Sequence, residues 1–307
     1  MSELIISPMQ PDEWSQVGAL IHQSTNSWYQ SHLGHEIFNC SPSETDIFCK
    51  VYEALDPGCC LIARLDGNIA GSCFYHPRPT HISLGILNVA SDYFGRGIAR
   101  ALLNAVCEIA DAENKTVRLI SSALNLDSFS LYSRAGFCPK AVYQDMIIPY
   151  PEHGHIYKSP PTFTVRDAAI EDLEGMVELE LKHTGLSRKK DFKYFLENSE
   201  GIWHTSIAVM ESGELSGFMV SHVHPASAIV GPGFATSEEV AEALVCEELN
   251  FRGPSTPLIV VPAIASNLIK SLYARGARNL ELHLGQARGV FQEPTGYQFP
   301  TFLPETA

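Results

Sequence analysis

The sequence predicts a mixed α/β fold that occurs twice in tandem, and three observations support this prediction. Short apolar patterns typical of strands alternate with stretches that have the 3.6-residue periodicity of amphipathic helices. The same order of elements returns after a segment rich in proline, histidine and glycine, from Tyr150 to Pro161. At 307 residues the chain has the length of two domains of roughly 150 residues each.

The first half is expected to begin with a short strand and a helix capped by Asp12. The dipeptide Asp66-Gly67 predicts a two-residue hairpin turn, because Asp-Gly readily adopts the positive φ angles of such turns. The elements expected in this half are a strand at 4–6, a helix from Trp14, a less regular helical region at 26–56, strands at 60–65, 69–75 and 81–89, a helix at 98–110, a strand at 117–122, a helix at 128–135 and a strand at 141–148.

The second half repeats this order. The sequence therefore predicts an N-terminal domain at 1–149, a linker at 150–161 and a C-terminal domain at 162–307. The elements expected after the linker are a strand at 163–166, a helix at 170–181, strands at 206–210 and 215–223, a short strand ending at Val230, a helix at 237–249, a strand at 258–261, a helix at 268–275 and a strand at 280–284.

The composition argues against several classes of protein. A formal charge of −14 is the opposite of the basic surface that nucleic-acid binding needs. No apolar run approaches the length of roughly 20 residues that spans a bilayer, and the N-terminus has no secretory signal pattern. We therefore expect no nucleic-acid partner, no membrane partner and a cytoplasmic location.

The cysteines and histidines do not form a metal-binding pattern. No Cys-x-x-Cys pair occurs among the eight cysteines, and most of them lie in apolar runs, as small core residues of a reduced protein do. The pair in His153-Gly154-His155 has no third ligand nearby in the sequence. We expect no bound metal.

The stretch from Leu87 to Leu103 has the pattern of a strand, a glycine-containing turn and a long helix. Gly95 and Gly97 permit positive φ angles and a close approach of a ligand to the backbone. The free N–H groups and the positive dipole end of the helix beginning at Ile98 favour phosphate binding, and Arg96 and Arg100 add positive charge. Taken alone, this pattern favours an ordinary strand, turn and helix, in which the glycines serve only the turn.

A second motif lies downstream. Tyr132 follows Asn125 by seven positions, and Gly136 and Phe137 mark the end of a helix and the start of a strand. A tyrosine on such a helix is more often a core residue than a catalytic one. A phenol with a pKa near about 10 is nevertheless suited to protonate a thiolate leaving group.

Together these motifs resemble the GCN5-related N-acetyltransferase (GNAT) superfamily over roughly residues 3 to 148. The family signature Arg/Gln-x-x-Gly-x-Gly/Ala aligns with Phe94, Gly97 and Ala99. The family segment Asn…Leu-Tyr…Gly-Phe aligns with Asn125, Leu131, Tyr132, Gly136 and Phe137. The resemblance implies an acyl-CoA N-acyltransferase fold that uses acetyl-CoA as cosubstrate.

The resemblance also implies a role for each residue. A bulge and splay in the strand ending at Val89 would expose backbone groups to the pantetheine arm. The turn amides would bind the pyrophosphate, and Tyr132 would protonate the departing thiolate after direct attack by the amine. The residues implied in cofactor binding are Leu87, Val89, Gly95, Arg96, Gly97, Ile98, Ala99, Arg100 and Asn125.

Two features depart from the family pattern. Phe94 stands where the family has Arg or Gln, which predicts an altered phosphate contact rather than loss of binding, because the turn acts through backbone amides. The strand segment from His81 to Gly85 offers no acidic side chain as general base. His76 and His81 are the alternatives, since histidine titrates near neutrality, although each is more readily explained as a surface or loop histidine.

The second half resembles a degenerate domain of the same family. Gly231-Pro232-Gly233 makes a poor phosphate cradle because proline has no N–H. The segment Tyr273 to Gly276 is similar to the segment from Leu131 and Tyr132 to Gly136, but Ala277 replaces the aromatic residue. A structural role, extending the sheet and lining the substrate cleft, is favoured over a second active site.

Three functions are compatible with these observations. The leading one is transfer of acetyl from acetyl-CoA to a primary amine of a small molecule or peptide. A non-catalytic acyl-CoA sensor or interaction module would retain the fold without turnover, and tandem GNAT folds also host longer acyl or amino-acyl donors. Asn125 and Tyr132 favour catalysis, whereas Phe94 and the missing carboxylate favour the sensor.

Overall fold

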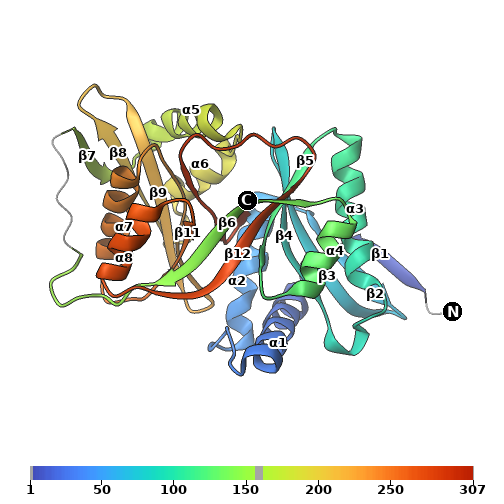
Figure 1. Cartoon of the computed structure of the whole chain (residues 1–307). Helices are drawn as coiled ribbons and strands as arrows, with labels where there is room; N and C mark the ends of the chain where they lie inside the picture. Colours follow the sequence, from blue (N-terminus) through green and yellow to red (C-terminus); the bar gives the residue numbers. More distant parts are fainter. Residues whose placement is uncertain (1–2, 156–161, 307) are drawn as a thin grey trace. The chain divides into compact units, whose positions relative to one another are not determined.

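The computed structural model describes residues 3–155 and 162–306, which form two compact units (Figure 1). Unit 1 contains the described chain up to Leu119 together with the C-terminal segment Phe302–Thr306, and unit 2 contains Ile120–Thr301. The expected domain boundaries at 149 and 162 stay predictions, and residues 156–161 of the expected linker lie outside the described residues.

Unit 1 is a sheet with the strand order β1-β2-β3-β4-β5, in which β4 and β5 are parallel and the other neighbours are antiparallel. The Asp66-Gly67 turn between β2 and β3 is confirmed, with φ angles of 51° and 85°. The elements are β1 (Leu4–Pro8), η1 (Pro11–Glu13), α1 (Trp14–Leu33), η2 (Pro42–Thr45), α2 (Asp46–Leu55), β2 (Cys60–Leu65), β3 (Asn68–Pro77), β4 (His81–Val89), η3 (Ser91–Tyr93), α3 (Ile98–Ala112), the start of β5 (Thr116–Ser122), and the C-terminal pair β14 (Thr301–Phe302) and β15 (Glu305–Thr306).

Helices cover both faces of the unit 1 sheet. Tyr52 of α2 packs edge-on against Phe74 of β3, with ring centroids 4.7 Å apart. A Cβ at Gly71 of β3 would lie only 3.0 Å from Ile98 and 3.2 Å from Leu102 of α3, so glycine permits close packing there. Because residues three apart on a strand point to opposite faces, α2 and α3 lie on opposite sides of the sheet.

Unit 2 contains strands in the order β12-β6-β11-β10-β9-β8-β7, and β13 pairs with β10. The last strand of the first half, β6, lies between β12 and β11 and is antiparallel to both. The elements are the end of β5, α4 (Leu126–Arg134), β6 (Cys138–Ile147), β7 (Phe163–Asp167), η4 (Ile170–Asp172), α5 (Leu173–Thr184), α6 (Lys189–Glu197), β8 (Trp203–Met210), β9 (Leu215–His224), β10 (Ser227–Ala235), α7 (Glu238–Arg252), β11 (Leu258–Pro262), α8 (Ser266–Ala274), β12 (Arg278–Arg288) and β13 (Tyr297–Phe299).

The core of unit 2 also has two layers of helices around the sheet. Leu244 of α7 and Leu272 of α8 belong to one buried cluster with Met219 of β9. Phe192 of α6 packs against Phe218, the neighbouring residue of β9, at a centroid distance of 4.8 Å. Since neighbouring strand residues point to opposite faces, α6 and α7 lie on opposite sides of β9.

The order of elements expected from the sequence is present, but some local expectations are wrong. Asp12 lies in η1, and the residue preceding α1 is Glu13, without a side-chain cap. The helix expected to become irregular at Asn26 continues to Leu33. The side-chain amide of Asn26 instead orders the following loop, because its Oδ1 accepts hydrogen bonds from the amides of Ile37 and Phe38.

In the second half, α6 and the short strands β13, β14 and β15 were not expected from the sequence. Gly231-Pro232-Gly233 lies inside β10 and not in a turn before the helix. A bulge accommodates the proline, which removes one donor from the strand without ending it.

All eight cysteines are described and carry free thiols, and five of them are buried, as expected of core residues. Among the described residues, no helix combines the length and the apolar character that a bilayer crossing requires.

Candidate functional site

The second half of β4 has a free edge. Its parallel pairing with β5 covers His81, Ile82 and Ser83, whereas its antiparallel pairing with β3 continues to Val89. The first five residues of β4 are buried, and the residues from Ile86 onward are half-buried. The strands β4 and β5 therefore separate beyond Ser83, and the backbone of β4 becomes accessible there.

A β-bulge marks the start of this free edge. Tyr75 pairs with Leu84 and Cys73 pairs with Leu87, so that two residues of β4, Gly85 and Ile86, face one residue of β3. A Cβ at Gly85 would lie 2.9 Å from the Cβ of Phe74, too close for a side chain. The bulge that the family resemblance implied in this strand is therefore present.

The hydrogen bonds after the bulge determine which backbone groups face the free edge. Ala90 N donates to Ala70 O of the neighbouring strand segment at 3.0 Å, so the peptide groups of Ala90, and of Asn88 two positions earlier, face β3. Successive residues of a strand direct their N–H and C=O groups to opposite edges. The backbone groups of Leu87 and Val89 consequently face the free edge.

The turn after β4 leads into a helix whose first backbone amides have no hydrogen-bond partner within the helix. Gly95 and Gly97 have φ angles of 76° and 80°, and both face open space. Gly97 precedes α3, and no side chain caps the helix. The first helical hydrogen bond runs from Ala101 N to Gly97 O at 3.0 Å, which leaves the amides of the first three helical residues outside the helical ladder.

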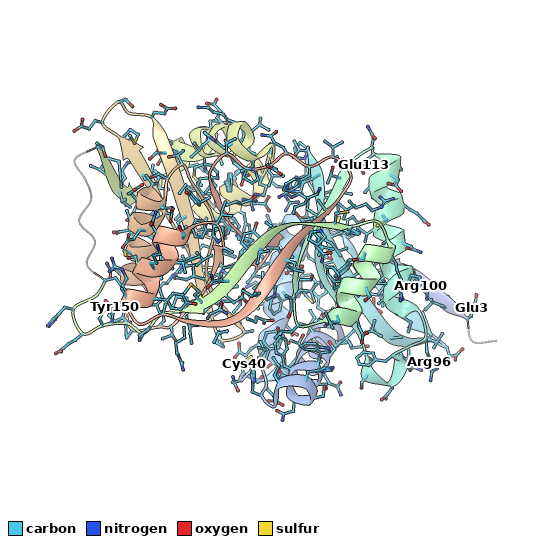
Figure 2. All side chains as sticks on the ribbon, viewed as in Figure 1. Glu3, Cys40, Arg96, Arg100, Glu113 and Tyr150 are labelled. Carbon is cyan, nitrogen blue, oxygen red and sulfur yellow. The ribbon has the colours of Figure 1, made fainter. Side chains whose placement is uncertain are left out.

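Two arginines lie beside this turn. Arg96 and Arg100 lie exposed at the N-terminal end of α3 (Figure 2), and the guanidinium of Arg96 lies 5.4 Å from the ring centroid of Tyr93. The first turn of α3 contains no acidic residue. Phe94 is 57% exposed and does not fill the turn. Free amides, a helix dipole and two arginines together favour an anion.

Asn125 and Tyr132, the other predicted site residues, belong to unit 2. Asn125 caps α4, because its Oδ1 accepts a hydrogen bond from Ser128 N at 2.9 Å. Tyr132 is 8% exposed and packs against Phe137 at a centroid distance of 5.8 Å. Gly136 has the left-handed conformation expected after the helix, with φ of 89°. The contacts of all the predicted site residues with a cofactor stay predictions.

His76 and His81 are not surface or loop residues, which corrects the expectation from the sequence. Both lie in strands and are 1% exposed. His76 Nδ1 lies 2.7 Å from Asp56 Oδ2, and Arg78 Nη1 donates to both oxygens of Asp56 at 2.9 Å. This buried ion-pair cluster fixes His76 but withholds it from an incoming amine. The burial of His76 could not be expected from the sequence. No local pattern distinguishes a buried histidine in β3 from an exposed one.

Strand β10 of unit 2 repeats the geometry of β4. Its parallel pairing with β11 ends at Val230, and Gly231 and Pro232 then face Val220 alone in a second bulge. Thr236 N donates to the neighbouring strand at 2.9 Å, as Ala90 N does in unit 1. The registers make the following residues equivalent: Gly71 and Gly217, His76 and His222, Gly85 and Gly231, Leu87 and Gly233, and Val89 and Ala235.

In unit 2 the equivalent edge is occupied by the chain itself. β13 pairs antiparallel with β10, with Gly233 opposite Phe299 and Ala235 opposite Tyr297. The carbonyl oxygen of Pro300 lies where a side chain at Gly231 would have to go. The backbone groups that correspond to those of Leu87 and Val89 are therefore paired within the protein.

The beginning of α7 also differs from that of α3. The hydroxyl of Ser237 accepts a hydrogen bond from Val240 N at 3.3 Å, and the first turn contains Glu238 and Glu239. The carboxylate of Glu238 accepts from the amides of Asn267 and Leu268 at 2.6 and 2.7 Å. A phosphate at this helix would meet a capped end and two negative charges.

Tyr273 is not the counterpart of Tyr132, which corrects the alignment made from the sequence. At the end of α4, Phe137 N donates to Tyr132 O, and at the end of α8, Ala277 N donates to Leu272 O. Leu272, which is fully buried, therefore takes the position of Tyr132, and Tyr273 is 46% exposed. Tyr132 precedes Gly136 by four positions, whereas Tyr273 precedes Gly276 by three. The similar residues of the two segments made this difference easy to overlook.

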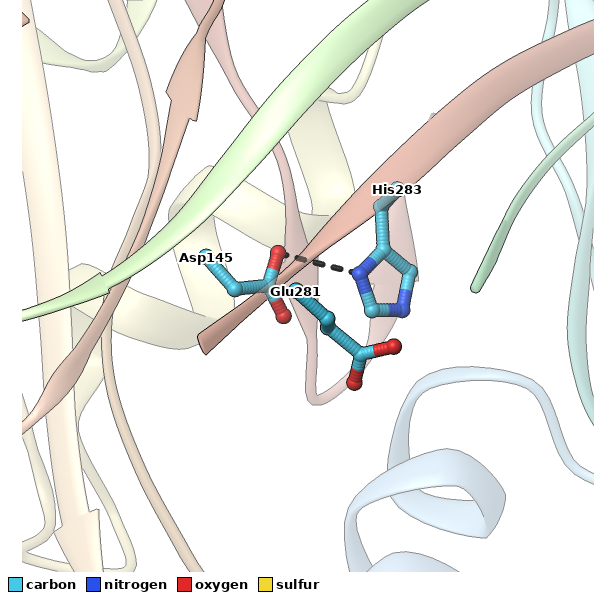
Figure 3. Close-up of side chains that lie close together, drawn as sticks. All are labelled: Asp145, Glu281 and His283. Carbon is cyan, nitrogen blue, oxygen red and sulfur yellow. Dashed lines mark hydrogen bonds and ion pairs between the residues drawn. The ribbon is translucent and has the colours of Figure 1, made fainter. Parts of the chain in front are cut away.

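Asp145, Glu281 and His283 form a cluster of possible metal ligands in unit 2, with donor atoms within 4.8 Å of one another (Figure 3). Asp145 and Glu281 are opposite each other on β6 and β12. His283 Nδ1 lies 3.0 Å from Asp145 Oδ1, and Ser122 Oγ donates to Glu281. Burial opposes protonation of His283, but the neighbouring Asp145 carboxylate raises its pKa. These side chains therefore interact with one another through hydrogen bonds and charge. The expected absence of a metal stays a prediction.

Comparison with protein families agrees with this geometry in both halves. Residues 23–137 match the acetyltransferase (GNAT) family, and residues 176–283 match a second model, described as an acetyltransferase (GNAT) domain. The two segments do not overlap and together cover well over half of the chain. The chain therefore belongs to the GNAT family and is a tandem GNAT protein.

Solved structures with this fold cover nearly the whole chain. A putative acetyltransferase from Pyrococcus horikoshii has a TM-score of 0.76 at 16% identity, covering 98% of this chain and 95% of its own. A GCN5-related N-acetyltransferase from Sphaerobacter thermophilus has a TM-score of 0.65 at 17% identity, covering 94% and 96%. A tandem GNAT protein from the clavulanic acid biosynthesis pathway has a TM-score of 0.60 at 15% identity, covering 93% and 98%. At these identities the likeness establishes the fold, and no curated protein sequence matches the chain.

Proposed function

We propose that the N-terminal GNAT segment is an N-acetyltransferase that transfers the acetyl group of acetyl-CoA to a primary amine of a small molecule or peptide. The observation that carries this proposal is the free edge of β4 followed by the uncapped start of α3. The amides and carbonyls of a pantetheine arm complement the backbone of Leu87 and Val89. The pyrophosphate complements the amides from Gly95 to Arg100.

The proposed reaction is direct attack of a neutral amine on the thioester carbonyl, with Tyr132 protonating the departing thiolate. The assignment of Tyr132 rests on the family match over residues 23–137, which contains both predicted motifs. Positioning of the two substrates and proton transfer would supply most of the rate enhancement, because an amine and a thioester need no further activation chemistry. The acidic composition suits a cationic amine, and the eight free thiols suit a cytoplasmic location.

We further propose that the C-terminal GNAT segment does not bind the cofactor. Its counterpart of the pantetheine-binding edge is paired with β13, and its counterpart of the pyrophosphate-binding helix start carries Glu238 and Glu239. These features favour a structural role for this half, as expected of a degenerate domain.

Calorimetric titration with acetyl-CoA tests both proposals. We expect one molecule bound per chain and a rise in melting temperature, since a ligand at 100 times its dissociation constant adds about 2.7 kcal/mol of stability. No binding at millimolar acetyl-CoA would overturn the proposed function, and two equivalents would overturn the structural role of the second half. Thiol release with a panel of primary amines then separates an enzyme from a sensor, which would bind without turnover.

A further inference from the structure

The two halves of the chain exchange their last strands. β5 of the first half pairs with β12, the last strand of the second half, and Ala123 N at the end of β5 donates to Leu282 O at 2.8 Å. β11, the counterpart of β5, pairs instead with β6, and Ala263 N donates to Val142 O at 2.8 Å. The second half therefore supplies the strand that lies beside the end of β5.

The two exchanged pairings are related by a constant offset in the sequence. Leu282 lies 140 positions after Val142, which accepts the equivalent hydrogen bond. The residues that follow α4 and α8, Phe137 and Ala277, are related by the same offset. Each residue of β12 therefore has a known equivalent in β6.

Three ionisable residues share one face of the pair formed by β6 and β12. Asp145 of β6 lies directly opposite Glu281 of β12, and His283 follows Glu281 on the same face. Met146 belongs to the buried cluster that contains Leu272 of α8. Because neighbouring strand residues point to opposite faces, Asp145 points away from α8.

The same face is turned away from α4, which carries the proposed proton donor Tyr132. Tyr143 and His283 are equivalent by the offset and pair directly opposite each other, so the offset relates residues on one face of the sheet. α4 therefore lies on the same face as its equivalent α8. A group on the opposite face is placed to contact an acceptor without occupying the place of the proton donor.

The three side chains form a connected group (Figure 3). His283 Nδ1 lies 3.0 Å from Asp145 Oδ1, and Ser122 Oγ at the end of β5 donates to Glu281. Although burial opposes protonation of His283, the neighbouring Asp145 carboxylate raises its pKa, so the pair carries no net charge. Asp145 and His283 are buried, whereas Glu281 is only half-buried and adds one negative charge that solvent reaches.

The equivalent place beside β11 has no such group. The equivalents of Asp145, Glu281 and His283, found by the same offset, are Gly285, Ala141 and Tyr143. The half that has the free edge of β4 thus has the carboxylates beside its β5, and the half whose edge is filled by β13 lacks them beside β11. A functional role explains this difference, because strand pairing itself needs no ionised side chain at either place.

We propose that Glu281 binds the cationic amine of the acceptor and thereby selects charged amines, while Ser122 and the pair of His283 and Asp145 hold its carboxylate in position. The proposal rests on the proposed acetyltransferase function and deepens it. It also gives the degenerate half a role in that function, since its last strand delivers the acceptor-binding carboxylate to the end of β5.

Two matched acceptors test this selection in the full-length chain. Ethylamine is cationic at pH 7, whereas trifluoroethylamine has the same carbon skeleton and is largely uncharged, because fluorine withdraws electron density from the nitrogen. Glu281→Gln should raise KM for ethylamine by about tenfold or more, since it removes a hydrogen bond between charged groups. The same variant should leave KM for trifluoroethylamine and the affinity for acetyl-CoA within a few-fold of the wild-type values, measured by thiol release and calorimetry.

Three further variants control this experiment. Glu178→Gln removes an exposed carboxylate from α5 of the same unit and should leave KM for both amines unchanged. Glu281→Asp keeps the charge and should raise KM for ethylamine less than Glu281→Gln does. Ser122→Ala removes the hydroxyl that donates to Glu281 and should raise KM for ethylamine by a smaller factor, again sparing trifluoroethylamine. An unchanged melting temperature shows that a variant is folded.

The outcomes distinguish the amine site from the proposed function. An unchanged KM for ethylamine in Glu281→Gln, or an equal rise in KM for both amines, would overturn the role of Glu281 and leave the acetyltransferase intact. Failure of the wild-type chain to release thiol with any primary amine, despite binding acetyl-CoA, would overturn the proposed function and with it the amine site.

Discussion

Strands β4 and β10 have the same bulge, and each stops pairing with its parallel neighbour at this bulge. The strands differ in what lies along the edge beyond it. The edge after the bulge of β4 is open at Leu87 and Val89, whereas the equivalent edge of β10 pairs with β13. A bulged strand of this kind therefore leaves a row of backbone groups unpaired by its parallel neighbour in either unit. What fills that row is decided by a segment far away in the sequence.

The connection from β4 to α3 is longer than the equivalent connection from β10 to α7. Ile98 and Val240 are equivalent because each lies against the glycine of the neighbouring strand, Gly71 or Gly217. Nine positions separate Val89 from Ile98, but five separate the equivalent Ala235 from Val240. The second unit therefore has too short a connection to form the glycine turn, and its helix start is capped by its own side chains.

The largest effect is expected at the proposed proton donor. Tyr132→Phe keeps the packing against Phe137 but removes the hydroxyl, and it should lower turnover by about 10²-fold with nearly unchanged affinity for acetyl-CoA. Tyr273→Phe should leave turnover unchanged, because Leu272 and not Tyr273 takes the equivalent place in the second unit. Steady-state kinetics with thiol detection measure both variants. Unchanged turnover in Tyr132→Phe would falsify the assignment of this residue.

The next largest effect is a loss of folding stability at acid pH. We expect it at His222, the equivalent in unit 2 of His76. Burial lowers the pKa of His222 to about 3, whereas His76 has the Asp56 carboxylate beside it. Because the folded chain holds His222 neutral, stability is retained above its unfolded pKa of about 6.5 and is lost as pH falls below that value. At pH 5 this cost amounts to about 2 kcal/mol relative to pH 7.

Urea unfolding at pH 7 and pH 5 measures this cost. His222→Gln, which cannot titrate, should reduce the loss of stability between the two pH values, and the exposed control His35→Gln should leave it unchanged. An equal loss in the wild type and in His222→Gln would assign the acid sensitivity to another group.

The third prediction concerns an acidic residue in the first turn of α3, where α7 has acidic residues and α3 has none. Ala99→Glu places a carboxylate at the second residue of α3, as Glu239 is the second residue of α7, and should weaken acetyl-CoA binding by at least about tenfold through repulsion of the pyrophosphate. The free protein should keep its stability, since an acidic residue at a helix N-terminus is favourable when no anion is bound. Asn104→Glu, in the exposed middle of α3, is the matched control. Equal affinity in both variants would place the pyrophosphate elsewhere.

The smallest effect is expected at Phe94, where the family has Arg or Gln. Phe94→Arg adds a cation beside the open turn and should tighten acetyl-CoA binding by about two- to fivefold at low salt, with the gain shrinking at high ionic strength. Phe94→Gln, without a charge, should change affinity less. A salt-independent gain would point to side-chain packing and not to charge.

Much of the candidate site could be predicted from the sequence, because its features are local. The turn from Gly95 to Gly97 and the start of α3 at Ile98 follow from residues that adjoin in the chain. The hairpin at Asp66-Gly67 is local in the same way. The helix α6 was not expected because its nine residues, rich in lysine and with Phe192 and Phe195 as the buried aromatic positions, give too short a periodic pattern.

The family, the order of most elements and the glycine turn could thus be read from the sequence, because each of these depends on short-range spacing. Only the folded chain shows that β10 pairs with β13, that Leu272 takes the place of the tyrosine, and that β15 lies against β4. Strand pairing and burial join residues that are far apart in the chain, and no local pattern records such contacts.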